Sequence, residues 1–391
     1  MQLTLQTKLL PTEEQSRLLA ATQQRYSQLC NYLSILVHQT HITHPMAMHR
    51  QFYKDLRFMF ADLPCQMVVR AFAKVSGAYR ARIANAKRRK KSTNFTKPCV
   101  FRTNTTIDYD QRIYSVMSFT KSIQTSSRCT TIKFSIATIT GRIHIDAMIP
   151  STMLTKLGSR WKQATLNYRK SSKEWYLNLA CDIDETPPKP YTKYLGVDLG
   201  ITNIASTSDG TLYSGTSVDA KRVNHYIQVR QLQKRGTRSS KRKLIKINRR
   251  MSNYIRTLNH TVSKQLVEQA QRTGSAIVLE QLKYIFDTLK ARRAQRQRMF
   301  GWSFAQLRDF IVYKAKWLGV QVIVVDPKYT SQTCPECGHI ARNNRKGERF
   351  RCRRCDYESH ADTNGALNIG MLGMFSDHCQ ELGMASPSYH K

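Results

Sequence analysis

Three carboxylates stand next to apolar segments that lie far apart in the sequence. Asp198 follows a short β-prone run, Glu280 ends the run 276–279, and Asp362 precedes a helix-like apolar pattern. Burying such a charge is costly unless something compensates it, and a divalent cation is the usual compensation. Acids that converge from two strands and a helix can hold two Mg²⁺ ions roughly 3.5 to 4 Å apart, an arrangement that hydrolyses phosphodiesters. Taken singly, each acid is weak evidence, because a lone Asp at a strand end is more often a turn or capping residue.

Four cysteines have the spacing of a metal site. They form two Cys-x2-Cys pairs separated by fourteen residues: Cys334, Cys337, Cys352 and Cys355. This pattern is typical of tetrahedral Zn²⁺, and four thiolates leave no open position, so we expect a structural zinc. A redox pair or disulfides are the alternatives. The segment with these cysteines would fold as a small zinc ribbon just before Asp362, so its folding should help to place that carboxylate.

The order and context of the acids resemble a known family. Gly196-Val-Asp198-Leu-Gly200, then Leu279-Glu280, then Asp362-Thr-Asn364-Gly-Ala-Leu-Asn368 are similar to the split RuvC-like nuclease motif of TnpB, the OrfB-type proteins of bacterial insertion sequences. The Tyr-Lys-Ala helix ahead of the cysteines is also similar. Asp198, Glu280 and Asp362 would then be the catalytic Mg²⁺ ligands. Two residues depart from the family pattern: His360 replaces a frequent acid, and Gly365 replaces an alanine, a mild weakening of the helix.

The coarse pattern along the chain predicts its elements. A strand over residues 2–10 precedes a helix that starts with a capping box at Thr12 and Gln15, and a second helix starts after Pro64. Alternating runs indicate antiparallel strands between 95 and 185. Later elements are a long helix from Lys241, a helix over 302–319 and a buried strand over 320–325.

The resemblance implies an α/β plus β-barrel fold with an RNase H-like (RuvC) nuclease domain, an inserted zinc ribbon, and a wedge barrel carrying a helical recognition insertion. The predicted boundaries are 1–11 and 95–186 for the wedge, 12–94 for the recognition lobe, 187–328 and 359–372 for the nuclease domain, 329–358 for the ribbon, and 373–391 for a tail expected to be disordered.

The charge of the chain points to nucleic acid. It has 63 Lys and Arg against 26 Asp and Glu, a net charge of +37 and a pI near 10.1. Such self-repulsion is tolerated when a polyanion neutralises it. No acid lies between Asp62 and Asp108, between Asp219 and Glu268, or between Asp287 and Asp309, so these windows are candidate phosphate-binding faces. Solvated surface charge is the alternative. The candidate contacts are Lys87, Arg88, Arg89, Lys90, Arg249, Arg250, Arg256, Arg292 and Arg293.

No segment has the pattern of a membrane span, and the N-terminus lacks the apolar core of a signal peptide. We therefore expect a cytoplasmic, nucleoid-associated protein with no membrane partner. The six cysteines outside the metal pattern are expected to be reduced: Cys30, Cys65, Cys99, Cys129, Cys181 and Cys379.

The resemblance implies an RNA-guided endonuclease that cuts double-stranded target DNA. A transposon-derived (omega-type) guide RNA would supply recognition by base pairing, and the protein would act as a monomer within a ribonucleoprotein. Three alternatives share features with this interpretation. A compact type V CRISPR effector would carry the same motifs, an RNA-guided repressor would have lost acids that this chain retains, and a transposase acting alone would need strand-joining chemistry.

Overall fold

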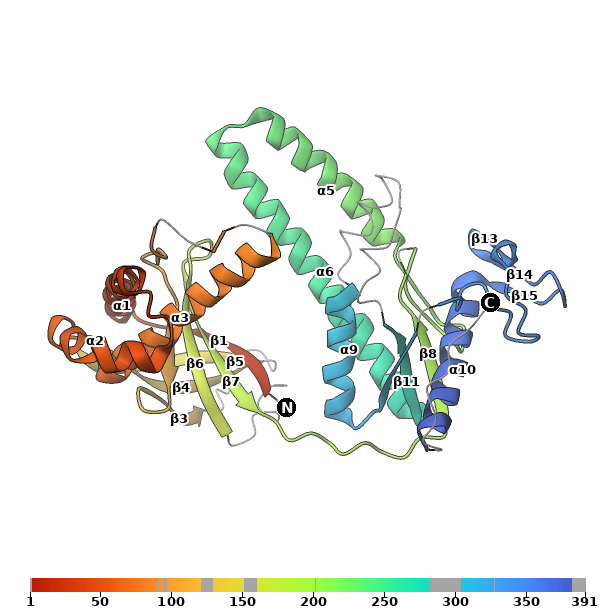
Figure 1. The fold of residues 1–391 in the computed structure, drawn as a ribbon, viewed down its shortest axis with the longest axis horizontal. Coiled ribbons are helices and arrows are strands. Elements are labelled where there is room, and N and C mark those ends of the chain that lie inside the picture. The colour runs from red at the N-terminus through yellow and green to blue at the C-terminus, as the bar shows by residue number, and fades with distance from the viewer. Residues whose placement is uncertain are drawn as a thin grey trace. The chain divides into compact units, whose positions relative to one another are not determined.

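The computed structural model describes residues 2–89, 92–93, 97–120, 129–150, 160–200, 202–281, 304–326 and 328–381. The chain divides into two compact units, Met1–Asp184 and Glu185–Lys391 (Figure 1). In the part of the chain so described, none of the helices is long and apolar enough to cross a lipid bilayer.

The first unit is built on one antiparallel sheet. Its seven strands lie in the order β2-β6-β7-β1-β5-β4-β3. The two edge strands, β2 and β3, follow each other through a short turn, and the Tyr109 hydroxyl on β2 donates to the Ala137 carbonyl on β4 over 3.0 Å. The sheet is thus nearly closed, which fits the expected barrel. The strands are β1 (Gln2–Leu9), β2 (Ile107–Asp110), β3 (Tyr114–Thr120), β4 (Cys129–Thr138), β5 (Gly141–Pro150), β6 (Arg160–Arg169) and β7 (Glu174–Asp182).

Three helices lie between β1 and β2 in the sequence. They are α1 (Glu13–Thr40), α2 (Pro45–Met59) and α3 (Cys65–Arg88). The capping box at Thr12 and Gln15 is confirmed, because both reciprocal hydrogen bonds are present. Helix α2 was not foreseen. The buried faces of the helices and the sheet interior form one hydrophobic core, with Tyr26, Phe72 and Phe134 among its largest members.

The second unit has a mixed sheet with helices on both faces. Strand β8 pairs with β9 antiparallel and with β11 parallel, and β11 pairs with β12 parallel, giving the order β10-β9-β8-β11-β12. The strands are β8 (Lys193–Asp198), β9 (Asn203–Thr207), β10 (Leu212–Ser214), β11 (Ser275–Glu280) and β12 (Val322–Val325). The helices are α5 (Thr216–Arg235), α6 (Arg238–Thr273), α9 (Phe304–Leu318) and α10 (Ala361–Glu381). Helix α5 was not foreseen.

The alternation of side chains along β11 assigns the two faces of this sheet. Ile277 and Leu279 pack in the core that includes α6 and α9, whereas Val278 packs with Ile369 and Leu372 of α10. Side chains of a strand alternate between faces, so Glu280 shares the α10 face with Val278.

Glycines allow α10 to lie directly on β8. A Cβ added to Gly196 would stand 2.0 Å from the Ala366 carbonyl oxygen and 2.5 Å from the Gly370 nitrogen, and both are backbone atoms that cannot easily move. The close approach of helix and strand therefore requires glycine at position 196. Because Asp198 has the same parity as Gly196 along β8, the fold directs it toward α10.

The prediction of a tail that starts at residue 373 is wrong for residues 373–381. Helix α10 continues through Glu381, well beyond residue 373. Two tyrosine hydroxyls, of Tyr191 and Tyr194, donate to the Asp377 carboxylate over 2.5 and 3.0 Å, and Ser376 is buried. These contacts hold the C-terminal turns against the start of the unit. Residues 382–391 lie outside the described residues.

The cysteine-rich segment forms a small antiparallel sheet between β12 and α10. Its strands are β13 (Arg345–Lys346), β14 (Arg349–Arg351) and β15 (Glu358–His360). Its buried apolar cluster contains little more than Phe350, Ala361 and the cysteines, so the segment has almost no core of its own.

Candidate functional site

Asp198 and Glu280 lie side by side at the carboxyl ends of parallel strands. Leu279 pairs with Val197 in the β8–β11 register, so each acid is the next residue on its strand. Both are directed to the same face of the sheet by parity. Burial and then the charge of Asp198 raise the pKa of Glu280, as expected for two carboxylates at neighbouring strand ends.

Asp362 completes the group from the first turn of α10. Its Oδ1 accepts from Arg345 over 2.9 Å, and its Oδ2 accepts from the Asn203 side chain over 3.0 Å. The Asp362 backbone N–H donates to Nδ1 of His360 over 3.2 Å. His360 therefore caps the helix in the way an acid would, which explains how this chain departs from the family pattern without losing the helix start. A carboxylate in the first turn also suits the helix dipole.

Burial and neighbouring carboxylates disfavour the ionised forms of two of the three acids. Burial, followed by the neighbouring Asp362 carboxylate, raises the pKa of Asp198 to about 6, although Arg345 opposes the shift. Burial and Asp198 raise the pKa of Glu280 to about 8, against a hydrogen bond from Thr330 that lowers it. Two carboxyls whose charged forms are disfavoured in this way are suited to bind a cation, which removes both penalties.

The donor set fits a hard divalent cation. The side chains present only carboxylate oxygens, the ligands that Mg²⁺ and Mn²⁺ prefer. Of the described residues, however, only the four cysteines bring all their ligand atoms within 4.8 Å of one another. The three acids are therefore a looser group, with the guanidinium of Arg345 on one of them.

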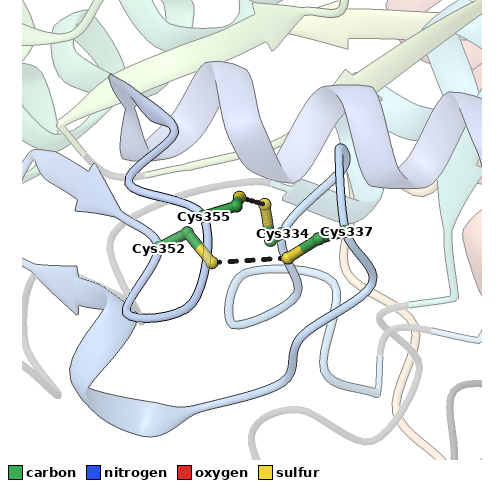
Figure 2. A group of neighbouring side chains, drawn as sticks. All are labelled: Cys334, Cys337, Cys352 and Cys355. Carbon is green, nitrogen blue, oxygen red and sulfur yellow. Dashed lines mark hydrogen bonds between the residues drawn. The ribbon is translucent and has the colours of Figure 1, made fainter.

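The four cysteines converge as the spacing predicts (Figure 2). Sγ of Cys334 lies 3.6 Å from that of Cys355, and Sγ of Cys337 lies 3.5 Å from that of Cys352. These separations are far beyond a disulfide and close to the edge of a ZnS4 tetrahedron, about 3.8 Å for Zn–S bonds of about 2.3 Å. Burial acts to raise the pKa of the Cys352 thiol, but the backbone N–H groups of Arg354 and Cys355 lower it to about 7. Gly338 adopts φ +70°, as the turn after Cys337 requires.

Three contacts at the acids were not foreseen from the sequence. They come from Arg345 and Asn203 on Asp362, and from Thr330, whose hydroxyl donates to Glu280. Gly365 also has a spatial role beyond helix weakening, because a Cβ there would stand 2.9 Å from Oδ2 of Asp198. No periodicity or spacing marks these residues, since each acts on an acid far away in the sequence or in another element.

The predicted nucleic-acid contacts are distributed over both units. Lys87, Arg88 and Arg89 are exposed at the end of α3. Arg249, Arg250 and Arg256 are exposed on α6. Lys90, Arg292 and Arg293 lie outside the described residues.

Comparison with known families matches two stretches of the chain. Residues 178–284 match the OrfB_IS605 family model, described as a probable transposase. Residues 304–369 match the model described as Cas12f1-like, TNB domain. The first match contains Asp198 and Glu280, and the second contains the cysteines and Asp362.

Curated relatives carry related names. A CRISPR-associated endodeoxyribonuclease Cas12f1 from Sulfoacidibacillus thermotolerans is 31% identical over 51% of this chain and 50% of its own length. A putative RNA-guided DNA endonuclease InsQ from Escherichia coli K12 is 28% identical over 54% and 57%. The TnpB-like protein MJ0751 of Methanocaldococcus jannaschii is 28% identical over 46% and 69%. The chain thus spans about half the length of the first relatives it matches, and the resemblance to TnpB and OrfB-type proteins is confirmed.

A solved structure shares the fold. The protein chain of a Cas12f1–sgRNA–target DNA complex superposes with a TM-score of 0.60 at 16% identity, over 92% of this chain and 83% of that one. At this level of identity the likeness shows the fold alone.

Proposed function

We propose that this chain is the protein component of an RNA-guided DNA endonuclease of an insertion sequence. It would hydrolyse double-stranded target DNA paired to a transposon-derived guide RNA. The observation that carries the proposal is the meeting of Asp198, Glu280 and Asp362. Burial and then Asp362 raise the pKa of Asp198, and burial and then Asp198 raise the pKa of Glu280. Names of the relatives, among them RNA-guided DNA endonuclease, support it.

The proposed parts follow the predicted boundaries. Residues 187–328 and 359–372 are assigned to an RNase H-like, RuvC-type nuclease domain and 329–358 to a zinc ribbon at the target DNA. Residues 1–11 and 95–186 are assigned to a wedge that holds the guide RNA, and 12–94 to a recognition lobe. The segment 373–381, which continues α10, joins the nuclease domain.

The three acids would hold Mg²⁺ in a two-metal arrangement. Bound Mg²⁺ would lower the pKa of water and stabilise the leaving oxygen of the DNA strand. The chain's own task is to hold Asp198 and Glu280 at the ends of neighbouring strands, where a bound cation would displace their protons, and to fix Asp362 through Asn203 and Arg345. The cysteines would hold Zn²⁺, which stabilises the fold without taking part in the chemistry.

The exposed basic residues of α3 and α6 are the proposed contacts to RNA and heteroduplex. The window from Asp219 to Glu268 contains fourteen Lys and Arg and no acid between its ends. Such a face binds a phosphate backbone by releasing counterions, independently of sequence. Base pairing with the guide would therefore supply the choice of target.

A compact type V CRISPR effector is the second candidate. The match of residues 304–369 to the Cas12f1-like TNB domain favours it, as does the Cas12f1 relative. The retained acids argue against an RNA-guided repressor that binds without cutting.

The RNA that accompanies the protein separates these candidates. The Asp198→Ala protein would be purified from cells that carry the native locus, because the substitution removes a ligand and no basic contact. An enriched RNA running from the 3′ flank of the gene into adjoining DNA would support the transposon-type nuclease. A repeat-plus-spacer RNA would move the protein to the CRISPR class. A folded, zinc-loaded protein without enriched RNA would contradict the guided mechanism.

A further inference from the structure

A short backbone segment connects the cysteine sheet to the acidic group. We call residues 329–333 the ribbon arm, since they lead from β12 to Cys334. The Asn368 side chain on α10 donates to the carbonyls of Thr330 and Thr333, both over 2.8 Å. Asn364, one helical turn earlier, donates to the Thr333 carbonyl over 3.0 Å. The two asparagines of the Asp362 motif thus hold the arm against the helix that carries Asp362.

The ribbon arm is also held from the cysteine side. The Asn344 side chain donates to the carbonyls of Gln332 and His339 over 3.0 and 3.3 Å. Cys334 follows the arm directly and is itself 1% exposed. Movement of the cysteine sheet would therefore be transmitted to the arm.

The first residue of the arm is held in an uncommon backbone conformation. Tyr329 adopts φ +62°, a left-handed conformation that residues with a side chain rarely take. It persists because the Tyr329 carbonyl accepts from the backbone N–H of Gln332 and from that of Thr333, over 2.9 and 3.0 Å. Strained backbone of this kind is kept where the surroundings determine it and where it serves a site.

The strained turn places one hydroxyl on one acid. Thr330 is 4% exposed, and its Oγ1 donates to Oε1 of Glu280 over 2.5 Å. Glu280 ends a strand in a different segment, so this hydrogen bond ties its carboxylate to the ribbon arm. A donated hydrogen bond to one carboxylate oxygen fixes the group and leaves the other oxygen for a cation.

We propose that Thr330 is a positioning residue for Glu280, and that the ribbon arm makes the affinity of the acidic group for divalent metal depend on folding of the cysteine sheet. This inference rests on the proposed function, because it takes Glu280 as a metal ligand. Thr330 is proposed to act through Glu280 alone.

The test compares Thr330→Val with Thr330→Ser. Valine keeps the shape and loses the hydroxyl, whereas serine keeps the hydroxyl. The full-length chain, freed of nucleic acid at high salt, is titrated with Mn²⁺ and the free ion is followed by electron paramagnetic resonance. We expect Thr330→Val to bind the Glu280-dependent Mn²⁺ about tenfold more weakly, with wild-type zinc content and melting temperature, and Thr330→Ser to bind as wild type does. Thr330→Ala repeats the test without a branched side chain, should valine disturb folding.

Glu280→Gln serves as the reference for a lost ligand and separates the two ways of failing. If Thr330→Val and Thr330→Ala bind Mn²⁺ as tightly as wild type does, while Glu280→Gln binds it more weakly, the role of Thr330 alone is overturned. Wild type that binds no more tightly than Glu280→Gln overturns Glu280 as a ligand, and with it both the inference and the proposed metal centre.

Discussion

Two acids of the first unit and two acids of the second are treated differently by the fold. In the first unit, Asp108 lies 2.9 Å from the Lys74 ammonium, and Glu174 lies 2.7 Å from that of Lys8. The hydrogen bond from Lys8, followed by that from Tyr176, lowers the pKa of Glu174 to about 2. In the second unit, no Lys or Arg of the described residues lies within ion-pair distance of Asp198 or Glu280, and their pKa values rise.

The difference separates acids that the chain's own cations neutralise from acids that no Lys or Arg of the described residues pairs with. The chain's own cations already neutralise Asp108 and Glu174, so these acids have little left to offer a metal. Asp198 and Glu280 are kept near each other at a cost in stability, in a chain with an excess of basic residues. Arg345 pairs with Asp362 only, so the lack of positive charge at Asp198 and Glu280 supports the proposal that a cation from outside binds there.

Replacing Cys337 with Ser should produce the largest effect, and one confined to the second unit. Binding of Zn²⁺ to such a site contributes roughly 10 to 16 kcal/mol, so the ribbon should unfold and release the arm that holds Glu280. We expect loss of zinc and of DNA cleavage together, measured by metal analysis and by cleavage of a plasmid target. A zinc-free variant that cleaves normally would contradict the link between ribbon and acids.

Replacing Lys74 with Met should affect stability and not chemistry. The side chains of Lys74 and Asp108 are only 15% and 29% exposed, so an unpaired Asp108 should lower the free energy of unfolding by about 2 kcal/mol. Lys133→Met is the control, since the Lys133–Asp146 pair is 3.9 Å long and about half exposed, and should cost under about 1 kcal/mol. Chemical denaturation measures both, and equal losses would show that burial does not set the value of the pair.

The pH dependence of stability should have opposite signs at the two kinds of acid. Glu174 has a lowered pKa in the folded state, so its contribution is present above about pH 4.5 and is lost as the pH falls through 2. Asp198 and Glu280 have raised pKa values, so stability is full below about pH 4 and declines as the pH rises toward 8.

Glu280→Gln isolates this decline without metal. It should match wild type near pH 5 and exceed it by at least about 1 kcal/mol at pH 9, because one pKa unit corresponds to about 1.4 kcal/mol. Melting curves at both pH values give the comparison. A wild type that is more stable than Glu280→Gln at pH 9 without metal would show that another group already neutralises the carboxylate.

Gly365→Ala should have the smallest effect. The added Cβ would approach Oδ2 of Asp198, the far end of a side chain that can rotate, while alanine favours the helix by about 1 kcal/mol. The net change in unfolding free energy should stay under about 1 kcal/mol. Gly77→Ala on α3 is the matched control, because a Cβ there meets nothing within 4 Å and should simply stabilise. A loss of several kcal/mol at Gly365 would mean that Asp198 cannot move.

Local patterns in the sequence were sufficient for the acids and the cysteines. Asp198 and Glu280 end apolar runs that form β8 and β11, and the two Cys-x2-Cys pairs converge as their spacing predicts. Predicting these features requires only the apolar pattern of a strand and the ligand spacing of a Cys-x2-Cys pair. The capping box at Thr12 and the strands β4, β5 and β7 were predictable for the same reason.

Contacts between distant segments were not predictable. Thr330 reaches Glu280 across 50 residues of sequence, and Asn203 reaches Asp362 across 159. Their roles depend on which strands become neighbours, information that no single segment carries. Helix α5 was missed because only Val218 and Leu232 are buried, so its apolar residues show no clear stripe. The end of α10 was missed because Asp377 is held by tyrosines from the start of the unit.

The most direct test of the account is cleavage by the reconstituted ribonucleoprotein with Mg²⁺. The protein with its co-purified RNA is mixed with a plasmid that carries the matching target, and wild type is compared with Asp198→Asn, which keeps the shape of the side chain and removes its charge. We predict cutting by wild type at the matched site only, and a loss of at least about 1,000-fold in rate for Asp198→Asn, which should still retain the RNA. Cutting by Asp198→Asn at the wild-type rate would contradict the assignment of the acidic group as the nuclease centre.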